Sequence, residues 1–354
     1  MGCGAEEREA VGGGGRAIDM TKYEVCSRIV LGLTGFCVLL APGCKSGKDP
    51  QPAPAQPPFM SAVAGSPPAV APADEAPPPE ATGGFDGKRA YEQVAKQVRF
   101  GPRPPGSLSI QKLQEYLQAE LKSYGCAVET DTFSADTPVG RVPMKNLLVK
   151  IPGQKPGIIL LGTHYDTKKL DDFVGADDGG SSTGVMLEMA RLLCKQPPGK
   201  YAVWIAFFDA EEAFNLVWKD PDNCYGSRQM AAQLAASGDL PKVKAFLLAD
   251  LVGGRTPHFR RDGGSTKWLV DLVWGVAARL GYGQIFLNEP FDVGGDDHFS
   301  FTKRKVPSVD IIDLSFDDVP YWHKPQDTLD KVSPKTLAIV GHTLMESVKE
   351  LQKR

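Results

Sequence analysis

Residues 158–164 have the sequence Ile-Ile-Leu-Leu-Gly-Thr-His, a short apolar run that ends in a histidine. A run of this length and composition is typical of a strand that is buried on both faces. Two later runs have the same form and lead to acidic residues: Tyr201–Phe208 lies before Glu211 and Glu212, and Ala245–Ala249 lies before Asp250. Because ligands in open α/β sheets bind at the carboxyl ends of the strands, we expect these polar residues to meet at one edge of a sheet.

Segments with helical spacing alternate with strand-like segments over most of the chain. Helices are expected at 88–98, 110–124, 185–194, 225–236, 267–280 and 334–351, and further strands at 127–133, 146–151 and 308–313. This alternation predicts one α/β domain over residues 84–354. We expect a three-layer sandwich, in which a mixed, mostly parallel sheet lies between helices on both faces.

Several His, Asp and Glu residues follow the predicted strands, and these side chains are ligands of zinc: His164, Asp178, Glu211, Glu212, Asp250 and His323. Neighbouring side chains on an extended segment point in opposite directions. One glutamate of the pair can therefore bind a metal while the other faces a substrate. Each residue also has an ordinary alternative, since a single Asp after a strand is usually a turn or cap residue, and paired Glu residues favour the start of a helix.

The first quarter of the chain does not have the pattern of a folded domain. Residues 1–19 are Gly-rich and acidic, unlike the start of an export signal, so we expect translation to begin at Met20. Residues 20–44 contain a short apolar run with basic flanks and end in Gly43-Cys44, which resembles the lipobox of bacterial lipoproteins. We expect a lipidated Cys44 and a periplasmic or cell-surface protein, with plain secretion as the alternative. Residues 45–83 are rich in Pro and Ala and predict a disordered linker.

Composition excludes several other classes of protein. Of seven cysteines, only Cys126, Cys194 and Cys224 fall in the predicted domain, which indicates neither a disulfide framework nor a cysteine metal site. The net charge is −3 and there are no basic runs, so nothing indicates nucleic-acid binding. The oligomeric state is not predicted.

Three motifs around the predicted ligands resemble the M28 zinc aminopeptidase superfamily. They are Gly162-Thr-His-Tyr-Asp-Thr167, Gly175-Ala-Asp-Asp178 and Phe208-Asp-Ala-Glu-Glu212. Other stretches are similar to its glutaminyl-peptide cyclotransferase branch: Gly101–Ser107, Asp131–Gly140, Glu211–Phe214 with Trp218, Tyr225–Arg228 and Asp296–His298. The resemblance covers nearly the whole predicted domain and implies a zinc aminopeptidase-like fold.

The cyclotransferase resemblance implies a zinc-dependent acyltransferase that converts the N-terminal glutamine of peptides to pyroglutamate and releases ammonia. It assigns one zinc to Asp178, Glu212 and His323, the acid/base role to Glu211, a hydrogen-bonded carboxylate pair to Asp250 and Asp296, and the pocket walls to Trp218 and Trp322. The chain departs from the family at two places. Thr163 and Thr183 stand where animal members carry a disulfide pair. One extra residue separates Glu212 from Trp218, so a core position is the alternative for this tryptophan.

The M28 resemblance also implies an alternative activity, that of an aminopeptidase. Two zinc ions would then share Asp178, with His164 and Asp250 completing the second site and Glu211 taking a proton from water. All five ligands are present, so the choice between the branches depends on the cyclotransferase-like stretches. Both activities act on peptide or protein N-termini. A third hypothesis, a tethered binding protein on an inactive fold, predicts damaged motifs, and the motifs are intact.

Overall fold

The structure is a computed structural model that describes residues 74–314 and 319–354. The expected export signal and Cys44 lie outside these residues. The longer elements are, in chain order, α1 (Gly87–Val98), α2 (Leu108–Ser123), β1 (Val128–Thr137), β2 (Gly140–Ile151), β3 (Ile158–His164), α3 (Gly180–Leu193), β4 (Ala202–Phe208), α4 (Tyr225–Ser237), β5 (Val243–Asp250), β6 (Phe259–Asp262), α5 (Lys267–Arg279), β7 (Phe286–Phe291), α6 (Phe299–Thr302), β8 (Ser308–Ile312) and α7 (Pro334–Lys353).

The main sheet is mixed and mostly parallel. Its six strands have the order β1-β2-β4-β3-β5-β8. β1 and β2 form an antiparallel hairpin, β2 also pairs antiparallel with β4, and β4, β3, β5 and β8 are parallel. Leu161 in the middle of β3 lies between Ile205 of β4 and Leu247 of β5, so this strand is central. The sheet type expected from the sequence is confirmed.

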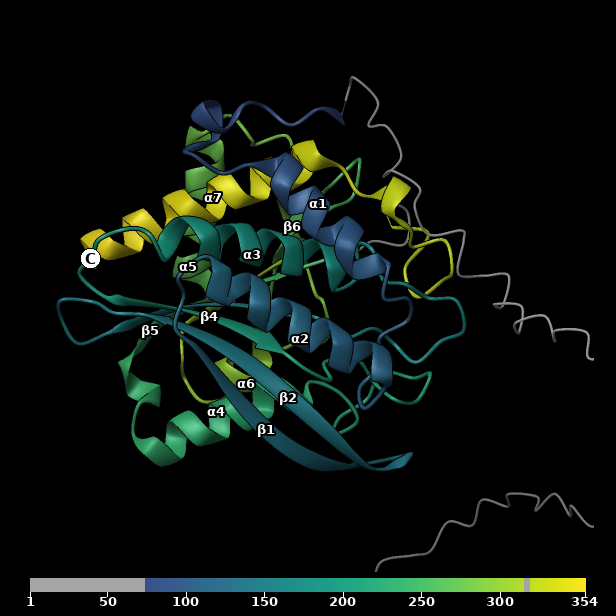
Figure 1. Ribbon diagram of the computed structural model, residues 1–354. Helices are drawn as coiled ribbons and strands as arrows, with labels where there is room; N and C mark the ends of the chain where they lie inside the picture. The colour runs from purple at the N-terminus through teal and green to yellow at the C-terminus, as the bar shows by residue number, and fades with distance from the viewer. Residues whose placement is uncertain (1–73, 315–318) are drawn as a thin grey trace, which may run out of the picture. The chain divides into compact units, whose positions relative to one another are not determined.

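Helices cover both faces of this sheet, as Figure 1 shows. Because successive side chains of a strand point to opposite faces, Leu161 belongs to the core that includes residues of α1, α2, α3, α5 and α7, whereas its neighbour Leu160 belongs to the core that includes residues of α4 and α6. Both leucines are fully buried. Burial of a leucine side chain stabilises a fold by about 1.5–3 kcal/mol. The three-layer arrangement is confirmed, and apolar residues on both faces of the strands account for it.

The carboxyl ends of β3, β4 and β5 lie at the same edge of the sheet because these strands are parallel. After β3, the loop of residues 165–179 leads into α3 through Gly179, whose φ is 75°. A Cβ atom at this position would lie 2.8 Å from the carbonyl oxygen of Asp166. The glycine therefore allows the loop to pass close to β3, and this loop carries Asp178.

The structure corrects two expectations. Cys126 and Cys194 form a disulfide with a Cα–Cα distance of 5.4 Å, although no disulfide framework was expected. They are 68 residues apart in sequence, and only the packing of α3 beside the start of β1 brings them together. The linker expected to run to residue 83 also ends earlier. Thr82 is fully buried, and Asp74 forms an ion pair with Arg255.

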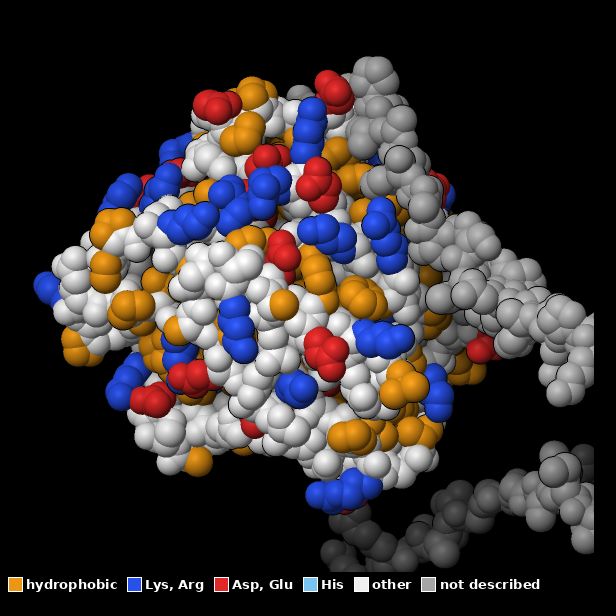
Figure 2. Space-filling model, viewed as in Figure 1, with side chains coloured by type: hydrophobic (Ala, Val, Ile, Leu, Met, Phe, Trp, Pro, Cys, Tyr) orange, Lys and Arg blue, Asp and Glu red, His pale blue; other side chains and the backbone are white. Residues whose placement is uncertain are grey.

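Two short strands, β6 and β7, form a second sheet that was not expected. The polar residues of Phe259–Asp262 and Phe286–Phe291 give no run long enough to indicate a strand. At the surface, the face shown in Figure 2 intersperses basic, acidic and apolar side chains, so it presents no field of a single sign. None of the helices within the described ranges is long and apolar enough to cross a membrane.

Candidate functional site

The predicted polar residues meet at the carboxyl edge of the main sheet. β3 and β5 end at His164 and Asp250, and Glu211 follows the end of β4 by three residues. Asp178, Asp296 and His323 lie on the loops that follow β3, β7 and β8. Each strand supplies a rigid base for the loop after it, which is the general arrangement of ligand sites in open α/β sheets.

Asp178 lies between two histidines. Its Oδ1 atom is 3.4 Å from His164 Nε2, and its Oδ2 atom is 3.4 Å from His323 Nε2. The same His323 nitrogen is 3.1 Å from Glu212 Oε1. The carboxylate of Asp178 is therefore shared by two groups of ligand atoms.

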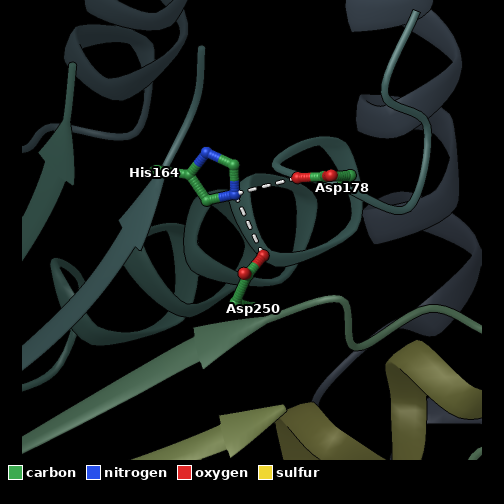
Figure 3. Close-up of side chains that lie close together, drawn as sticks. All are labelled: His164, Asp178 and Asp250. Carbon is green, nitrogen blue, oxygen red and sulfur yellow. Dashed lines mark hydrogen bonds and ion pairs between the residues drawn. The ribbon is translucent and has the colours of Figure 1, made fainter. Parts of the chain in front are cut away.

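The first group comprises Asp178, Glu212 and His323, whose ligand atoms all lie within 4.8 Å of one another. The second comprises His164, Asp178 and Asp250, with His164 Nε2 3.0 Å from Asp250 Oδ1. Figure 3 shows the His164 ring directing this nitrogen toward both carboxylates, from the ends of neighbouring strands and the α3 loop. The structure thus brings together both ligand sets that the sequence suggested.

Glu211 and Glu212 are held by one buried carboxylate. Their backbone N–H groups donate to Asp166 Oδ1 and Oδ2 at 3.1 and 3.3 Å. The Glu212 side chain then faces His323, while Glu211 Oε2 lies 3.8 Å from His164 Nδ1. Cys224 contacts Glu211 Oε1 at 4.0 Å. The two carboxylates therefore point to different parts of the site, as adjacent residues on an extended segment should.

A pocket of about 140 Å³ opens onto these residues. Trp218 and Trp322 both line it, together with Asp178, Glu211, Glu212, Asp250, Asp296 and His323. The Trp322 ring stacks on His323 with centroids 4.0 Å apart. Trp218 therefore lines the pocket in spite of the extra residue before it. The lining of the pocket therefore combines aromatic side chains with carboxylates.

The expected hydrogen bond between Asp250 and Asp296 is not formed. Asp250 Oδ1 instead contacts His164 and accepts from the N–H of Leu251 at 2.7 Å. Asp296 accepts from the N–H of Asp297, and its buried Oδ2 atom has no hydrogen-bond partner. The two carboxylates line the same pocket without bonding to each other, because His164 lies beside Asp250.

Burial controls the protonation of the acids in the pocket. It raises the pKa of Glu211 well above the usual range, an effect that His164 opposes and Asp296 reinforces. Burial likewise raises the pKa of Asp296, and the charges of Asp250 and Asp297 raise it further. Both groups are therefore suited to hold a proton, unlike a carboxylate in water.

Buried acids greatly outnumber buried bases in the described part of the chain. The buried Lys and Arg side chains are Lys168 and Arg103. The buried acids are Asp166, Asp177, Asp178, Glu188, Asp209, Glu211, Glu212, Asp222, Asp250, Asp262, Asp296, Asp297, Asp310, Asp313 and Asp327. Since an isolated buried charge is very unfavourable, these acids require hydrogen bonds, protons or a bound cation.

Sequence reasoning missed the residues that hold the Asp178 loop. Asp327 is fully buried and accepts from the backbone N–H groups of Asp177 and Asp178 at 2.8 and 3.0 Å. Arg103 is also fully buried and donates to the carbonyl oxygens of Val174 and Gly175 at the start of the loop. The available signal was modest: Asp327 follows His323 by four residues, and Arg103 lies in the family-like stretch Gly101–Ser107.

Lys168 is a third missed residue, four positions after His164. Its buried Nζ atom lies 3.5 Å from Glu212 Oε2 and donates to the carbonyl oxygen of Ala213 at 3.1 Å. This lysine neutralises part of the charge of Glu212 and fixes the outer oxygen of its carboxylate. The other oxygen, Oε1, is then directed at His323.

Strained backbone positions concentrate around the site. Ala210, Cys224, Leu251 and His323 all have φ values between 46° and 57°. Residues with a Cβ atom rarely adopt this left-handed conformation, which costs about 1–3 kcal/mol per residue. Ala210 directly precedes the glutamate pair, Leu251 directly follows Asp250, and His323 is itself a candidate metal ligand. The surrounding structure therefore imposes these conformations where the polar side chains converge.

The group of Asp178, Glu212 and His323 fits zinc. Two carboxylates and one imidazole are ligands of catalytic zinc sites, which keep a further position open. Ligand atoms about 2.0–2.2 Å from one zinc lie roughly 3.3 Å apart, and the observed separations from His323 Nε2 are 3.1 and 3.4 Å. Asp178 Oδ2 is also buried without a hydrogen-bond partner. Fold and site together are those of the zinc exopeptidase-like α/β proteins, with a group of residues that could hold a metal ion.

Comparison with known proteins agrees with this class. The model of peptidase family M28 matches residues 146–348, and the chain belongs to this family. A glutaminyl-peptide cyclotransferase-like protein of Mus musculus is 30% identical over 268 residues, which span 66% of this chain and 68% of the mouse protein.

Solved structures are similar over the same domain. An Acidobacteriales bacterium glutaminyl cyclase is 37% identical with a TM-score of 0.71, covering 81% of this chain and 99% of that protein. A Zn-dependent exopeptidase from Parabacteroides distasonis is 30% identical with a TM-score of 0.68, covering 74% of this chain and 97% of that one. The resemblance to M28 and its glutaminyl cyclase branch is confirmed.

Asp327 offers a test of how the metal ligands are held. Asp327→Asn removes one of the two acceptors for the Asp178 loop and places an amide N–H group against a backbone N–H group. We expect zinc affinity to fall by about 10- to 100-fold, as is typical when residues that orient metal ligands are changed. Competition with a chromogenic chelator measures the affinity.

The matched control is Asp330→Asn, which makes the same change at an exposed position of the same segment. It should leave zinc affinity unchanged. Equal affinities of Asp327→Asn and the unaltered protein would contradict the positioning role of Asp327.

Proposed function

We propose that this protein is a glutaminyl-peptide cyclotransferase, which converts the N-terminal glutamine of peptides to pyroglutamate and releases ammonia. The observation that carries this proposal is the division of the pocket into two parts. Asp178, Glu212 and His323 bring together ligand atoms that could hold a metal ion, while Glu211 and Asp296 are separate buried acids suited to carry protons. The relatives named glutaminyl cyclases and glutaminyl-peptide cyclotransferases support the same conclusion.

We propose one zinc ion per chain, held by Asp178, Glu212 and His323. When bound, zinc supplies Lewis-acid polarisation of a carbonyl oxygen. The chain contributes to this site through Asp327, which fixes the Asp178 loop, and Lys168, which fixes Glu212. Both contacts orient the ligands before the substrate arrives.

Cyclisation joins two groups of the same residue, so the pocket must bend the glutamine rather than bring in a second reactant. The α-amine nitrogen attacks the side-chain amide carbon, the bond from this carbon to the amide nitrogen breaks, and ammonia leaves. Glu211 takes a proton from the attacking amine and returns it to the departing nitrogen. A raised pKa suits this shuttle, since a general acid/base works best with a pKa near the operating pH.

Asp296 and the two tryptophans orient the substrate. Asp296 lines the pocket, and its carboxyl group binds the amine or the amide of the bound glutamine in this proposal. Trp218 and Trp322 form apolar walls around the reacting atoms. Because water is not a reactant in cyclisation, excluding it also protects the amide from hydrolysis.

The second candidate function is that of an aminopeptidase. The specific observation in its favour is the group of His164, Asp178 and Asp250, which supplies ligands for a second metal ion. In that reaction Glu211 would take a proton from water, and a terminal residue would be released. The similarity to the Zn-dependent exopeptidase from Parabacteroides distasonis also supports this alternative. The assay described below distinguishes the two activities.

We also propose that the protein is exported and lipidated at Cys44. The support is the apolar run with basic flanks that ends in Gly43-Cys44. The disulfide between Cys126 and Cys194 adds independent support, because disulfides persist mainly in oxidising compartments such as the periplasm or the cell exterior.

The deciding assay incubates the purified zinc-loaded protein with a glutamine-initiated peptide and with its leucine-initiated counterpart. Mass spectrometry separates the outcomes, since cyclisation removes ammonia and an aminopeptidase releases a whole residue. We expect loss of ammonia from the glutamine peptide and no change in the leucine peptide. Faster release of leucine than of ammonia would establish the aminopeptidase instead.

Cell fractionation tests the proposed anchor. Cys44→Ala should move the protein from the membrane fraction to the soluble exported fraction, because the site of acylation is lost, while activity is retained. Cys224→Ala is the matched control for loss of a cysteine and should leave the protein with the membranes. If the unaltered protein is already soluble outside the cytoplasm, it is secreted without a lipid anchor.

A further inference from the structure

A second cavity of about 220 Å³ lies beside the active-site pocket. The two cavities share Trp218, Gly295 and Asp296 as lining residues. A ligand that leaves the active-site pocket past Trp218 therefore meets this second cavity. We call it the basic side cavity, because Lys219, Arg228, Lys303 and Arg304 line it.

The two cavities are lined by different kinds of ionisable side chain. Asp178, Glu211, Glu212, Asp250 and Asp296 all line the active-site pocket, whereas the acids of the basic side cavity are Asp220 and Asp296. A molecule that extends from one cavity to the other thus passes from an acidic environment to a basic one. A peptide with a free amino terminus and a nearby acidic side chain has the complementary order of charges.

Three of the four cations have internal partners. Lys303 pairs with Asp220 at 3.2 Å, and Arg228 donates to the carbonyl oxygen of Pro221 at 2.6 Å. Lys219 and Arg304 are exposed and form no ion pair with any described residue. Arg304 donates only through Nη1, to the carbonyl oxygen of Ser300 at 2.8 Å. Both side chains are therefore available to an anion.

The boundary between the cavities suits an extended peptide. Gly294 and Gly295 have φ values of 79° and 150°, conformations that residues other than glycine rarely adopt. The indole nitrogen of Trp218 would lie 3.7 Å from a Cβ atom at Gly295, so the indole and the glycine backbone face each other. A bare backbone of this kind allows a peptide chain to approach closely while it crosses from one cavity to the other.

We propose that the basic side cavity binds an acidic side chain at one of the first positions after the N-terminal glutamine of the substrate. An extended chain advances about 3.5 Å per residue, so the second, third or fourth residue can reach a cavity that shares a wall with the pocket. Lys219 and Arg304 are the residues that determine this preference. The inference rests on the proposed cyclotransferase activity.

The test compares amidated tetrapeptides that begin with glutamine and carry one glutamate or one lysine among alanines, at the second, third or fourth position. Amidation removes the terminal carboxylate, which would otherwise compete for the cavity. At one position we expect kcat/KM to be about fivefold higher for the glutamate peptide than for the lysine peptide, the effect of an exposed ion pair. The ratio should approach one at about 1 M salt, where charges are screened.

The double substitution Lys219→Glu with Arg304→Glu should reverse this ratio. The ratio is measured within one preparation, so it does not depend on the fraction of folded protein. The matched control is Lys112→Glu with Lys335→Glu, which makes the same change in net charge at exposed positions that line neither cavity. It should keep the ratio of the unaltered protein.

The outcomes separate this inference from the proposed function. Cyclisation of all the peptides at equal kcat/KM, or an unchanged ratio in the Lys219→Glu, Arg304→Glu variant, would overturn the acidic subsite and leave the activity established. If none of the glutamine peptides is cyclised, the proposed function itself fails and the subsite fails with it.

Discussion

The burial of many carboxylates beside few cations is the constraint on which the rest of this structure depends. The described residues bury fifteen acids, but among the Lys and Arg side chains they bury only Arg103 and Lys168. Removing an ion from water costs several kcal/mol even after the protein relaxes. Each acid near the sheet edge must therefore accept hydrogen bonds, hold a proton or share a cation.

The three solutions correspond to three roles in the site. Asp166 and Asp327 accept backbone N–H groups, and this fixes the loops that carry Glu211, Glu212 and Asp178. Asp178 and Glu212 converge with His323, where a metal ion can balance their charge. Burial raises the pKa values of Glu211 and Asp296 in spite of the opposing effect of His164, and this suits them to carry protons. The interactions that stabilise each acid therefore also determine whether it fixes a loop, binds a metal ion or carries a proton.

The sheet and the metal ligands could be predicted because their signals are local. Apolar runs predicted β3, β4 and β5. The polar residues after them lie together because parallel strands end at the same edge of the sheet. The supporting contacts could not be predicted, since Asp327 and Arg103 act through backbone groups that are distant in sequence. The Cys126–Cys194 disulfide likewise depends on how α3 packs beside β1. The hydroxyl groups next to the site were not predicted either: Thr163 donates to Ser182 at 2.7 Å and Thr183 donates to the carbonyl oxygen of His164.

The central claim is that adjacent glutamates separate proton transfer from metal binding. Its most direct test measures zinc content and turnover together for Glu211→Gln and Glu212→Gln, two isosteric changes one residue apart. Glu211→Gln should keep one zinc per chain and lower turnover by about 10²-fold or more, because a general acid/base contributes that much. Glu212→Gln should lose zinc affinity, since it removes a charged ligand. Loss of zinc in Glu211→Gln with retention in Glu212→Gln would contradict the account.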